Sequence, residues 1–331
     1  MKPCRLLSLL LASAGLLLIA ACGVAPLAPP PPQTWSSIGD FPDPHIAADG
    51  VHWYAYATNG QGRNVQVLRS EDRVRWTALP DAMPMLAPWV RRGLTWAPQA
   101  MQVGANWLLY YTARDRASDK QCIGIATSAS PEGPFVDRRS APLVCQVAQG
   151  GTIDASAFRD SDGSLYLTYK NDGNCCAMST TLYAQALSAD GLSLLGAPAA
   201  LLTNEPGGWE GAVIEAPTLW RHTGRLLLFY SANDYGGASY AVGYAECTAP
   251  LGRCTRAPNL PLLKSRLDVT PALTGPGHQT LFKVGAQTYM AYHAWQVAAD
   301  GKRGNVRFLY IDLVDWDSTG RPVVRGPTLL P

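Results

Sequence analysis

The sequence predicts an all-β protein that folds as a five-bladed β-propeller. Five short segments rich in aromatic residues follow one another at nearly equal spacing, and a tight-turn signal precedes each of them. Glycine and proline are abundant, at 31 and 26 residues, and no window carries a sustained helical repeat of apolar residues with caps at both ends. Strand repeats of this length are typical of propeller blades around a central channel. A β-sandwich, the alternative fold, does not explain a five-fold period.

The N-terminal segment, residues 1–21, is expected to be a signal peptide. Lys2 and Arg5 precede an apolar run that is too short to cross about 30 Å of hydrocarbon comfortably, and no stop-transfer charge cluster follows it. The residues up to Cys22 resemble a bacterial lipobox, so we expect Cys22 to carry a lipid anchor. Ordinary secretion with cleavage near Ala21 is the alternative. Both interpretations place the mature chain outside the cytoplasm, either on a bacterial membrane or secreted.

Residues 22–33 are expected to be a spacer, because they include four consecutive prolines and proline-rich chains are extended. Residues 34–331 are predicted to form the propeller, and a monomer is expected. The formal net charge is only +2 and no long basic run is present, so a nucleic-acid partner is not expected.

Each predicted blade is marked by an aromatic strand, and the five strands align on a tyrosine. The aligned residues are Tyr56, Tyr111, Tyr169, Tyr230 and Tyr292, at successive spacings of 55, 58, 61 and 62 residues. This spacing suits four short antiparallel strands with their loops.

Six cysteines remain when Cys4 and Cys22 are set aside, and an even number in an exported chain favours disulfides. They are Cys122, Cys145, Cys175, Cys176, Cys247 and Cys254. Short intervening loops favour pairing the first two with each other and the last two with each other. The middle two are neighbours that either form a strained vicinal bridge or remain thiols. Zinc binding is a weaker alternative, because the spacings are not paired CxxC knuckles and no histidine cluster accompanies them.

Three acidic residues occur in apolar settings at corresponding places in three of the repeats. Asp43 lies between two prolines, Asp154 lies among small and apolar residues, and Glu215 follows two β-branched residues. Each precedes its repeat tyrosine by about 10 to 15 residues, so we expect the three carboxylates to converge on the central axis. Such convergence indicates a functional site rather than solvated surface. Glu210 is an alternative to Glu215, although its neighbours indicate a loop.

The mature chain resembles glycoside hydrolase family 43 over nearly its whole length. The resemblance is carried by DPH around Asp43, WAP at 96–98, the ID-S-x-F element at 153–158, EAP at 215–217 and GPGH at 275–278. No single motif is decisive, but the motifs occur in order and with sensible spacing. The resemblance implies a five-bladed propeller that hydrolyses glycosidic bonds with inversion.

The resemblance also implies a role for each acid. Asp43 is expected to be the general base, Glu215 the general acid, and Asp154 the residue that tunes the acid and orients it. Inverting hydrolysis needs one ionised carboxylate to activate water and one protonated carboxyl for the departing oxygen, roughly 6.5 to 9.5 Å apart. A third carboxylate and apolar neighbours would both help to keep the acid protonated.

Three further residues are candidates for substrate contact. Trp96 is expected to stack on a sugar ring, with a core position as the alternative. The resemblance places His278 in the central channel, where some family members hold a calcium ion or a water network, so His278 is a possible calcium site through water. Arg307 is expected to reach a sugar hydroxyl unless it faces solvent. No cofactor is expected to be required.

Substrate choice rests on the finer resemblance. The GPGHQT sequence and residues 230–245 resemble the α-L-arabinofuranosidase branch more than the β-xylosidase branch. The expected substrates are therefore α-L-arabinofuranosyl linkages in arabinan or arabinoxylan. A β-xylosidase or another glycosidase on the same fold is one alternative, and a non-catalytic sugar-binding lipoprotein is another. Fructan-active propellers, which retain configuration, carry different motifs.

Overall fold

The structure is a computed structural model that describes residues 38–268, 272–297 and 302–327. All described residues belong to one compact unit. The predicted signal peptide, the lipidation site Cys22 and the spacer 22–33 lie outside the described residues. Within the described part of the chain, no helix is both long and apolar enough to span a membrane.

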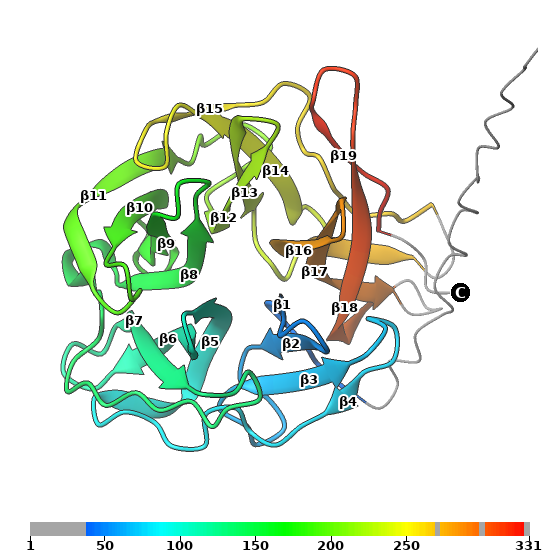
Figure 1. Cartoon of the computed structure of the whole chain (residues 1–331). Coiled ribbons are helices and arrows are strands. Elements are labelled where there is room, and N and C mark those ends of the chain that lie inside the picture. The colour runs from blue at the N-terminus through cyan, green and yellow to red at the C-terminus, as the bar shows by residue number, and fades with distance from the viewer. Residues whose placement is uncertain (1–37, 269–271, 298–301, 328–331) are drawn as a thin grey trace, which may run out of the picture. The chain divides into compact units, whose positions relative to one another are not determined.

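Five antiparallel sheets, each made of consecutive strands, surround a central axis as the blades of a propeller (Figure 1). Blade 1 contains β1 (His45–Ala48), β2 (Trp53–Ala57), β3 (Gln66–Ser70) and β4 (Thr77–Ala78). Blade 2 contains β5 (Val90–Val103), β6 (Asn106–Asp115) and β7 (Gln121–Ser128). Blade 3 contains β8 (Thr152–Arg159), β9 (Leu165–Asn171), β10 (Thr181–Leu187) and β11 (Leu194–Thr203).

Blade 4 contains β12 (Ile214–His222), β13 (Arg225–Ala232), β14 (Ala241–Cys247) and β15 (Cys254–Arg256). Blade 5 contains β16 (Leu273–Val284), β17 (Gln287–Val297), β18 (Arg303–Trp316) and β19 (Pro322–Val324). The first strand of each blade lies nearest the axis (Figure 1). The predicted all-β, five-bladed propeller is confirmed.

Blade 2 departs from the expected four strands. Beyond β7, only isolated bridges from Val136 and Val144 continue the sheet. The segment that would form the fourth strand contains Pro131, Pro134 and Pro142. Proline has no N–H to donate, so a continuous ladder cannot form there.

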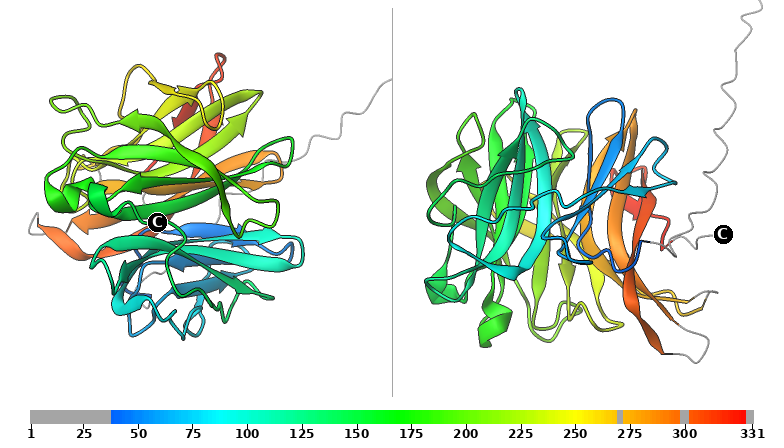
Figure 2. Two further views of the ribbon diagram at one scale, coloured as in Figure 1. Left: turned by 90° about the vertical axis from the view of Figure 1, so that its left-hand side faces the viewer. Right: turned by 90° about the horizontal axis from the view of Figure 1, so that it is seen from below.

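Two short 3-10 helices, η2 (Val147–Gln149) and η3 (Gly173–Cys176), flank the strand pair β8–β9. In both views of Figure 2 these coiled green ribbons lie on the same face of the propeller as the orange end of the β17–β18 pair.

Every inner strand, or the residues just before it, contains one residue other than glycine in the left-handed backbone conformation. These residues are Asp43, Ala97, Asp154, Ala216 and His278, with φ between 43° and 60°. In blades 2 to 5 the pairing with the second strand shifts by one residue at this point, which defines a β-bulge. In blade 1, Pro42 is opposite Thr58 and His45 is opposite Tyr56. Three steps along the inner strand therefore match two along the second strand, so this blade also has one extra residue. The five bulge residues are therefore structurally equivalent.

The bulges correct one expectation from the sequence. Asp43 and Asp154 occupy equivalent positions, but Glu215 lies one residue before the bulge residue of its blade, Ala216. The three acids therefore do not share one phase of the repeat, because spacing to a tyrosine does not reveal where the extra residue of a bulge falls.

A ring of hydrogen bonds joins each bulge to the preceding blade. The bulge N–H groups donate as follows: Ala97 to Thr58 Oγ1 at 2.9 Å, Asp154 to Thr112 Oγ1 at 3.2 Å, His278 to Ser231 Oγ at 2.8 Å and Asp43 to His293 Nδ1 at 3.1 Å. In blade 3 the corresponding acceptor position holds Lys170, which has no acceptor atom. The Ala216 N–H donates instead to Asp154 Oδ2, at 3.0 Å.

The core lies between neighbouring blades, and the same kind of packing closes the ring between blades 1 and 5. Phe41, Ile46, Phe282 and Leu309 are buried together there. The Phe41 N–H also donates to the carbonyl of Arg307, at 2.9 Å. The ring is thus closed between blades 1 and 5 by apolar packing and a few hydrogen bonds rather than by a shared strand.

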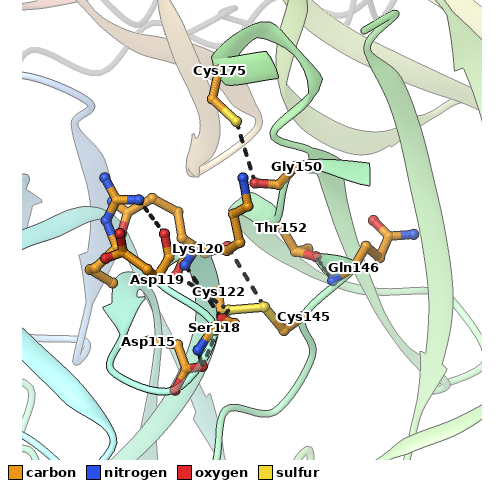
Figure 3. The surroundings of a disulfide bond; sticks show 12 residues. Asp115, Ser118, Asp119, Lys120, Cys122, Cys145, Gln146, Gly150, Thr152 and Cys175 are labelled. Carbon is orange, nitrogen blue, oxygen red and sulfur yellow. Dashed lines mark hydrogen bonds between the residues drawn. A yellow bond between two sulfur atoms is a disulfide. The ribbon is translucent and has the colours of Figure 1, made fainter. Parts of the chain in front are cut away.

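The two preferred disulfides are confirmed. Cys122 is bonded to Cys145 and Cys247 to Cys254. Figure 3 shows the first of these beneath the loop that carries Gly150. The alternatives left open for Cys175 and Cys176 are resolved in favour of a vicinal disulfide, which lies in η3.

Candidate active site

The three acidic residues predicted from the sequence come together at one end of the central channel. Asp43 precedes β1, Asp154 lies on β8 and Glu215 on β12, so three blades contribute one carboxylate each. Asp43, Asp154 and His278 line one small cavity at the level of the bulges. Glu215 lies beside it, close enough for its carboxylate to interact with that of Asp154. A larger cavity of about 610 Å³ lies beyond the bulges, and none of the three acids lines it.

Asp43 is held as an ionised carboxylate by its neighbours. The Thr58 hydroxyl donates to its Oδ2, and His278 Nδ1 lies 3.3 Å from its Oδ1. Burial alone would raise the pKa of Asp43, but positive charge and the Thr58 hydrogen bond outweigh burial and lower it to about 2. The groups whose electrostatic influence lowers it are, in order, His278, His293 and Arg307. Asp43 is therefore ionised at neutral pH.

His293 positions the backbone of Asp43. Burial lowers the pKa of His293 to about 3, although Asp43 acts in the opposite direction. The imidazole is therefore neutral at neutral pH, and its Nδ1 accepts the Asp43 N–H at 3.1 Å. The ring proton then lies on Nε2, which is buried without a hydrogen-bond partner.

Asp154 connects the acidic cluster to the backbone beside Glu215. It is only 6% exposed, and one of its oxygens accepts the N–H of Ala216. Burial raises the pKa of Asp154. His278 and Lys170 act against this rise, while the negative charge of Glu215 reinforces it.

Glu215 has a separate partner for each carboxylate oxygen. The Tyr240 hydroxyl donates to Oε1 at 2.7 Å, and Lys170 Nζ lies 3.2 Å from Oε2. The Lys170 side chain is completely buried and also donates to Asn174 Oδ1, at 2.9 Å. The negative charges of Glu215 and Asp43 add to burial in raising the pKa of Tyr240.

The other predicted contact residues lie around the same end of the channel. His278 is brought directly to Asp43. Arg307 also acts on Asp43, but its guanidinium is bonded to Asp40, with Nη2 2.7 Å from Oδ2. Trp96 is partly buried and immediately precedes the bulge residue of blade 2. Contact of these side chains with substrate stays a prediction.

Glu210, the alternative acid, is fully engaged elsewhere. It is only 1% exposed, and its oxygens accept hydrogen bonds from Tyr230, from the Glu205 N–H and from two nitrogens of Arg256. These partners outweigh the effect of burial and lower the pKa of Glu210. Its geometry is that of a structural ion pair.

Four polar residues of the site were not predicted: Thr58, Lys170, Tyr240 and His293. A signal for two of them was present. The residues that directly follow the aligned tyrosines of blades 2 to 5 are Thr112, Lys170, Ser231 and His293, a polar column inside apolar strands. In blade 1 the corresponding residue, Thr58, lies two positions after the aligned tyrosine instead of one. Nothing in the repeat marks Tyr240.

Among the described residues, no three His, Cys, Asp or Glu side chains are grouped as metal ligands. The buried Nε2 of His293 carries a proton, so it would repel a cation rather than bind it. A calcium ion held by His278 through water stays a prediction, and no chemical step depends on it.

The chain is similar to known glycoside hydrolases. A family model described as "Glycosyl hydrolases family 43" matches residues 37–322. The β-D-galactofuranosidase xynD of Aspergillus niger is 27% identical over 274 residues, which cover 77% of this chain and 74% of that protein. The extracellular endo-α-(1→5)-L-arabinanase of Thermotoga petrophila is 28% identical over 159 residues, which cover 38% of this chain and 33% of that protein.

Among solved structures, a thermostable family-43 glycoside hydrolase is similar to this chain with a TM-score of 0.80. Its sequence is 28% identical, and the match covers 91% of this chain and 98% of that one.

Proposed function

This chain belongs to family 43 of the glycosyl hydrolases, and from that premise we propose that it hydrolyses α-L-arabinofuranosyl linkages with inversion of configuration. The observation that carries the proposal is that two carboxylates at the end of the channel, those of Asp43 and Glu215, have different neighbours. Asp43 is ionised beside His278, His293 and Arg307, whereas Glu215 lies between the Tyr240 hydroxyl and the Lys170 ammonium and interacts with the carboxylate of Asp154.

In the proposed reaction, Asp43 acts as the general base. A water molecule attacks the anomeric carbon, and Asp43 takes one of its protons. Glu215 acts as the general acid and gives a proton to the glycosidic oxygen as the bond from that oxygen to the anomeric carbon breaks. The products are an alcohol and a sugar of inverted anomeric configuration. Asp154 orients Glu215 through the adjacent backbone N–H of Ala216.

The sugar is proposed to be a furanose. The resemblance of residues 230–245 and of the GPGHQT sequence supports an arabinofuranosyl substrate, as does the name of the Thermotoga relative. A β-D-galactofuranosyl substrate is the second candidate, because the Aspergillus relative with that activity in its name matches three quarters of this chain. The rings of these two sugars share one configuration and differ in the exocyclic chain, so one pocket shape suits both.

We further propose that the protein is exported and held on a membrane by a lipid on Cys22. Disulfides persist in oxidising compartments, and three are present. The relative from Thermotoga is extracellular by name.

The test is release of reducing sugar by the mature protein from aryl α-L-arabinofuranoside, aryl β-D-galactofuranoside, aryl β-D-xyloside, arabinan and arabinoxylan. We expect arabinose release, and we expect Glu215→Gln and Asp43→Asn each to lose at least about 10³-fold in kcat. Glu132→Gln, a change at a surface carboxylate paired with Arg69, serves as the control and should stay active. Activity should persist in EDTA.

Three results would contradict the proposal. If Glu215→Gln kept its turnover, Glu215 would not be the general acid. A first product of retained configuration, seen by NMR, would remove the inverting mechanism. Sugar binding without hydrolysis of any substrate would indicate a binding protein.

A further inference from the structure

We propose that the turn closed by the Cys175–Cys176 disulfide is the sugar-binding surface on the leaving-group side of the active site. The inference rests on the proposed function, since it concerns the sugar that departs when Glu215 donates its proton. Carbohydrate is therefore the ligand class, and the contact is made by the disulfide itself together with the side chain of Asn174.

The turn is connected to the candidate acid by a single buried ammonium group. Lys170 Nζ lies 3.2 Å from Glu215 Oε2 and donates to Asn174 Oδ1 at 2.9 Å. Asn174 and Cys175 are exposed and Cys176 is partly exposed, so the turn presents these groups to solvent next to the carboxylate.

The underside of the turn packs on the segment that leads to Asp154. Cys175 Sγ lies 3.5 Å from the carbonyl oxygen of Gly150, a contact visible in Figure 3. Lys120 Nζ lies 3.4 Å from Cys176 Sγ. A side chain at Gly150 would lie 2.3 Å from a carbonyl of the turn, so this close approach requires glycine.

The base of the turn is also held by hydrogen bonds that do not involve the disulfide. Asn171 already fixes its base, because the amide of this side chain donates to Ser179 O and accepts the N–H of Thr181. A bond between adjacent residues also closes no loop of chain, so it restricts the unfolded state little. The disulfide is exposed and contributes little to stability by this argument, so it is available for contact with a ligand.

The chemistry of the turn matches one face of a sugar ring. A disulfide has no N–H or O–H to donate, and Ala177 and Met178, the latter 45% exposed, continue an apolar surface beside it. The C–H face of a sugar can cover such a surface while its hydroxyls reach a polar group at the edge, here Asn174. Few polar groups placed on an apolar lining is the general pattern of specific small-molecule sites.

The partners of the candidate base and those of the candidate acid come from different blades. The histidines and the arginine that act on Asp43, namely His278, His293 and Arg307, come from blade 5. The charged partner of Glu215 and the vicinal disulfide both come from blade 3. Because the acid protonates the departing oxygen, the sugar on that oxygen lies toward blade 3.

The test measures binding separately from catalysis. In the inactive Glu215→Gln background, calorimetry gives the Kd of L-arabinose, which fills only the side of the cleaved sugar, and of α-1,5-L-arabinobiose, which fills both sides. In Cys175→Ser/Cys176→Ser we expect the Kd of the disaccharide to rise roughly tenfold. The Kd of the monosaccharide should stay the same. Cys247→Ser/Cys254→Ser, which opens the disulfide between the outer strands β14 and β15, should change neither Kd.

A second measurement covers the case in which the serine variant does not fold. Mild reduction of the otherwise wild-type disulfide in the Glu215→Gln protein, followed by iodoacetamide, places two polar amide groups on the exposed cysteines. Mass spectrometry confirms that only these two cysteines are modified. Disaccharide binding should then weaken at least as much as in the variant.

The outcomes separate the inference from the proposed function. An unchanged disaccharide Kd, or an equal rise for both sugars, overturns the inference while hydrolysis by the wild-type protein still supports the function. A wild-type protein that cleaves no arabinofuranoside overturns the proposed function, and the inference falls with it.

Discussion

At the scale of single residues, Lys170 interrupts a five-fold pattern. In the other four blades the corresponding side chain accepts a hydrogen bond from the next bulge, which lysine cannot do. Its ammonium instead reaches Glu215 and Asn174. The only lysine of the ring thus lies where the candidate acid needs a fixed orientation.

Lys170→Met is therefore expected to lower kcat about 10²-fold with a smaller change in KM, because Glu215 loses the partner that positions it. Lys170→Arg should recover part of the activity, since it keeps the charge. Lys283→Met removes an exposed lysine beyond the bulges and is the control. Steady-state kinetics on the substrate that the wild-type protein cleaves will decide, and equal activity of Lys170→Met and wild type would rule out a positioning role.

Asp172 makes stability depend on pH. Burial raises its pKa to about 6 against the opposing charge of Lys170, and Asp154 and Glu215 add to the rise. The native state therefore holds a proton that the unfolded chain releases near pH 3.8. This stabilisation is complete below about pH 4 and is lost as the pH rises through 6, a change of roughly 3 kcal/mol.

Asp172→Asn cannot ionise, so its free energy of unfolding relative to wild type should increase by roughly 2 to 3 kcal/mol between pH 4 and pH 7.5. Urea denaturation at both pH values measures this difference. Parallel pH dependence of the two proteins would show that the carboxyl group is not perturbed.

At the scale of elements, the bulge of β16 shows how backbone geometry places a catalytic partner. A side chain on Gly277 would lie 2.1 Å from the ring of Tyr240. That ring stacks on His293, with the centroids 5.9 Å apart, and its hydroxyl binds Glu215. The absence of a side chain at position 277 therefore allows a tyrosine of blade 4 to reach both acids.

Gly277→Ala is expected to displace Tyr240, to lower kcat at least about tenfold and to destabilise the fold by about 1 to 3 kcal/mol. Gly208→Ala is the matched control, because a side chain there meets only one carbonyl oxygen at 3.7 Å. Kinetics and thermal unfolding of both variants provide the measurement. Normal activity of Gly277→Ala would mean that Tyr240 is dispensable, which Tyr240→Phe would test directly.

At the scale of the whole molecule, the weak point of a ring of separate sheets is its closure. Blades 1 and 5 meet through a buried apolar cluster that contains Phe41, and through the bond of Arg307 to Asp40. No described strand is shared between these two sheets. The same contact holds Asp43 against His293, so closure and the geometry of the site depend on each other.

Phe41→Ala should cost about 3 to 5 kcal/mol, because it empties a fully buried position at the closure. Hydrogen exchange should accelerate in β1, β2, β17 and β18 together. Phe135→Ala, which empties a buried position against blades 1 and 2, should leave β17 and β18 protected. Faster exchange in blade 1 alone would mean that closure does not hold the two blades together.

The sequence by itself determined the number of blades, the main acids and two disulfides. Strands, turns and short loops are local, so the repeat and the pairs Cys122–Cys145 and Cys247–Cys254 could be read along the chain. The acids were identifiable because carboxylates in apolar stretches are unusual. None of these conclusions required knowing which blades are neighbours.

Only the tertiary structure decided how these residues act on one another. The bulges at Ala97 and Ala216 adopt positive φ without glycine or asparagine, so the one-residue offset of Glu215 left no trace in the sequence. Lys170 and His293 join the site through contacts between different blades, and Tyr240 joins it through a contact with Glu215 within blade 4. Such contacts depend on how strands and blades pack against one another, and composition and spacing along one chain do not encode that geometry locally.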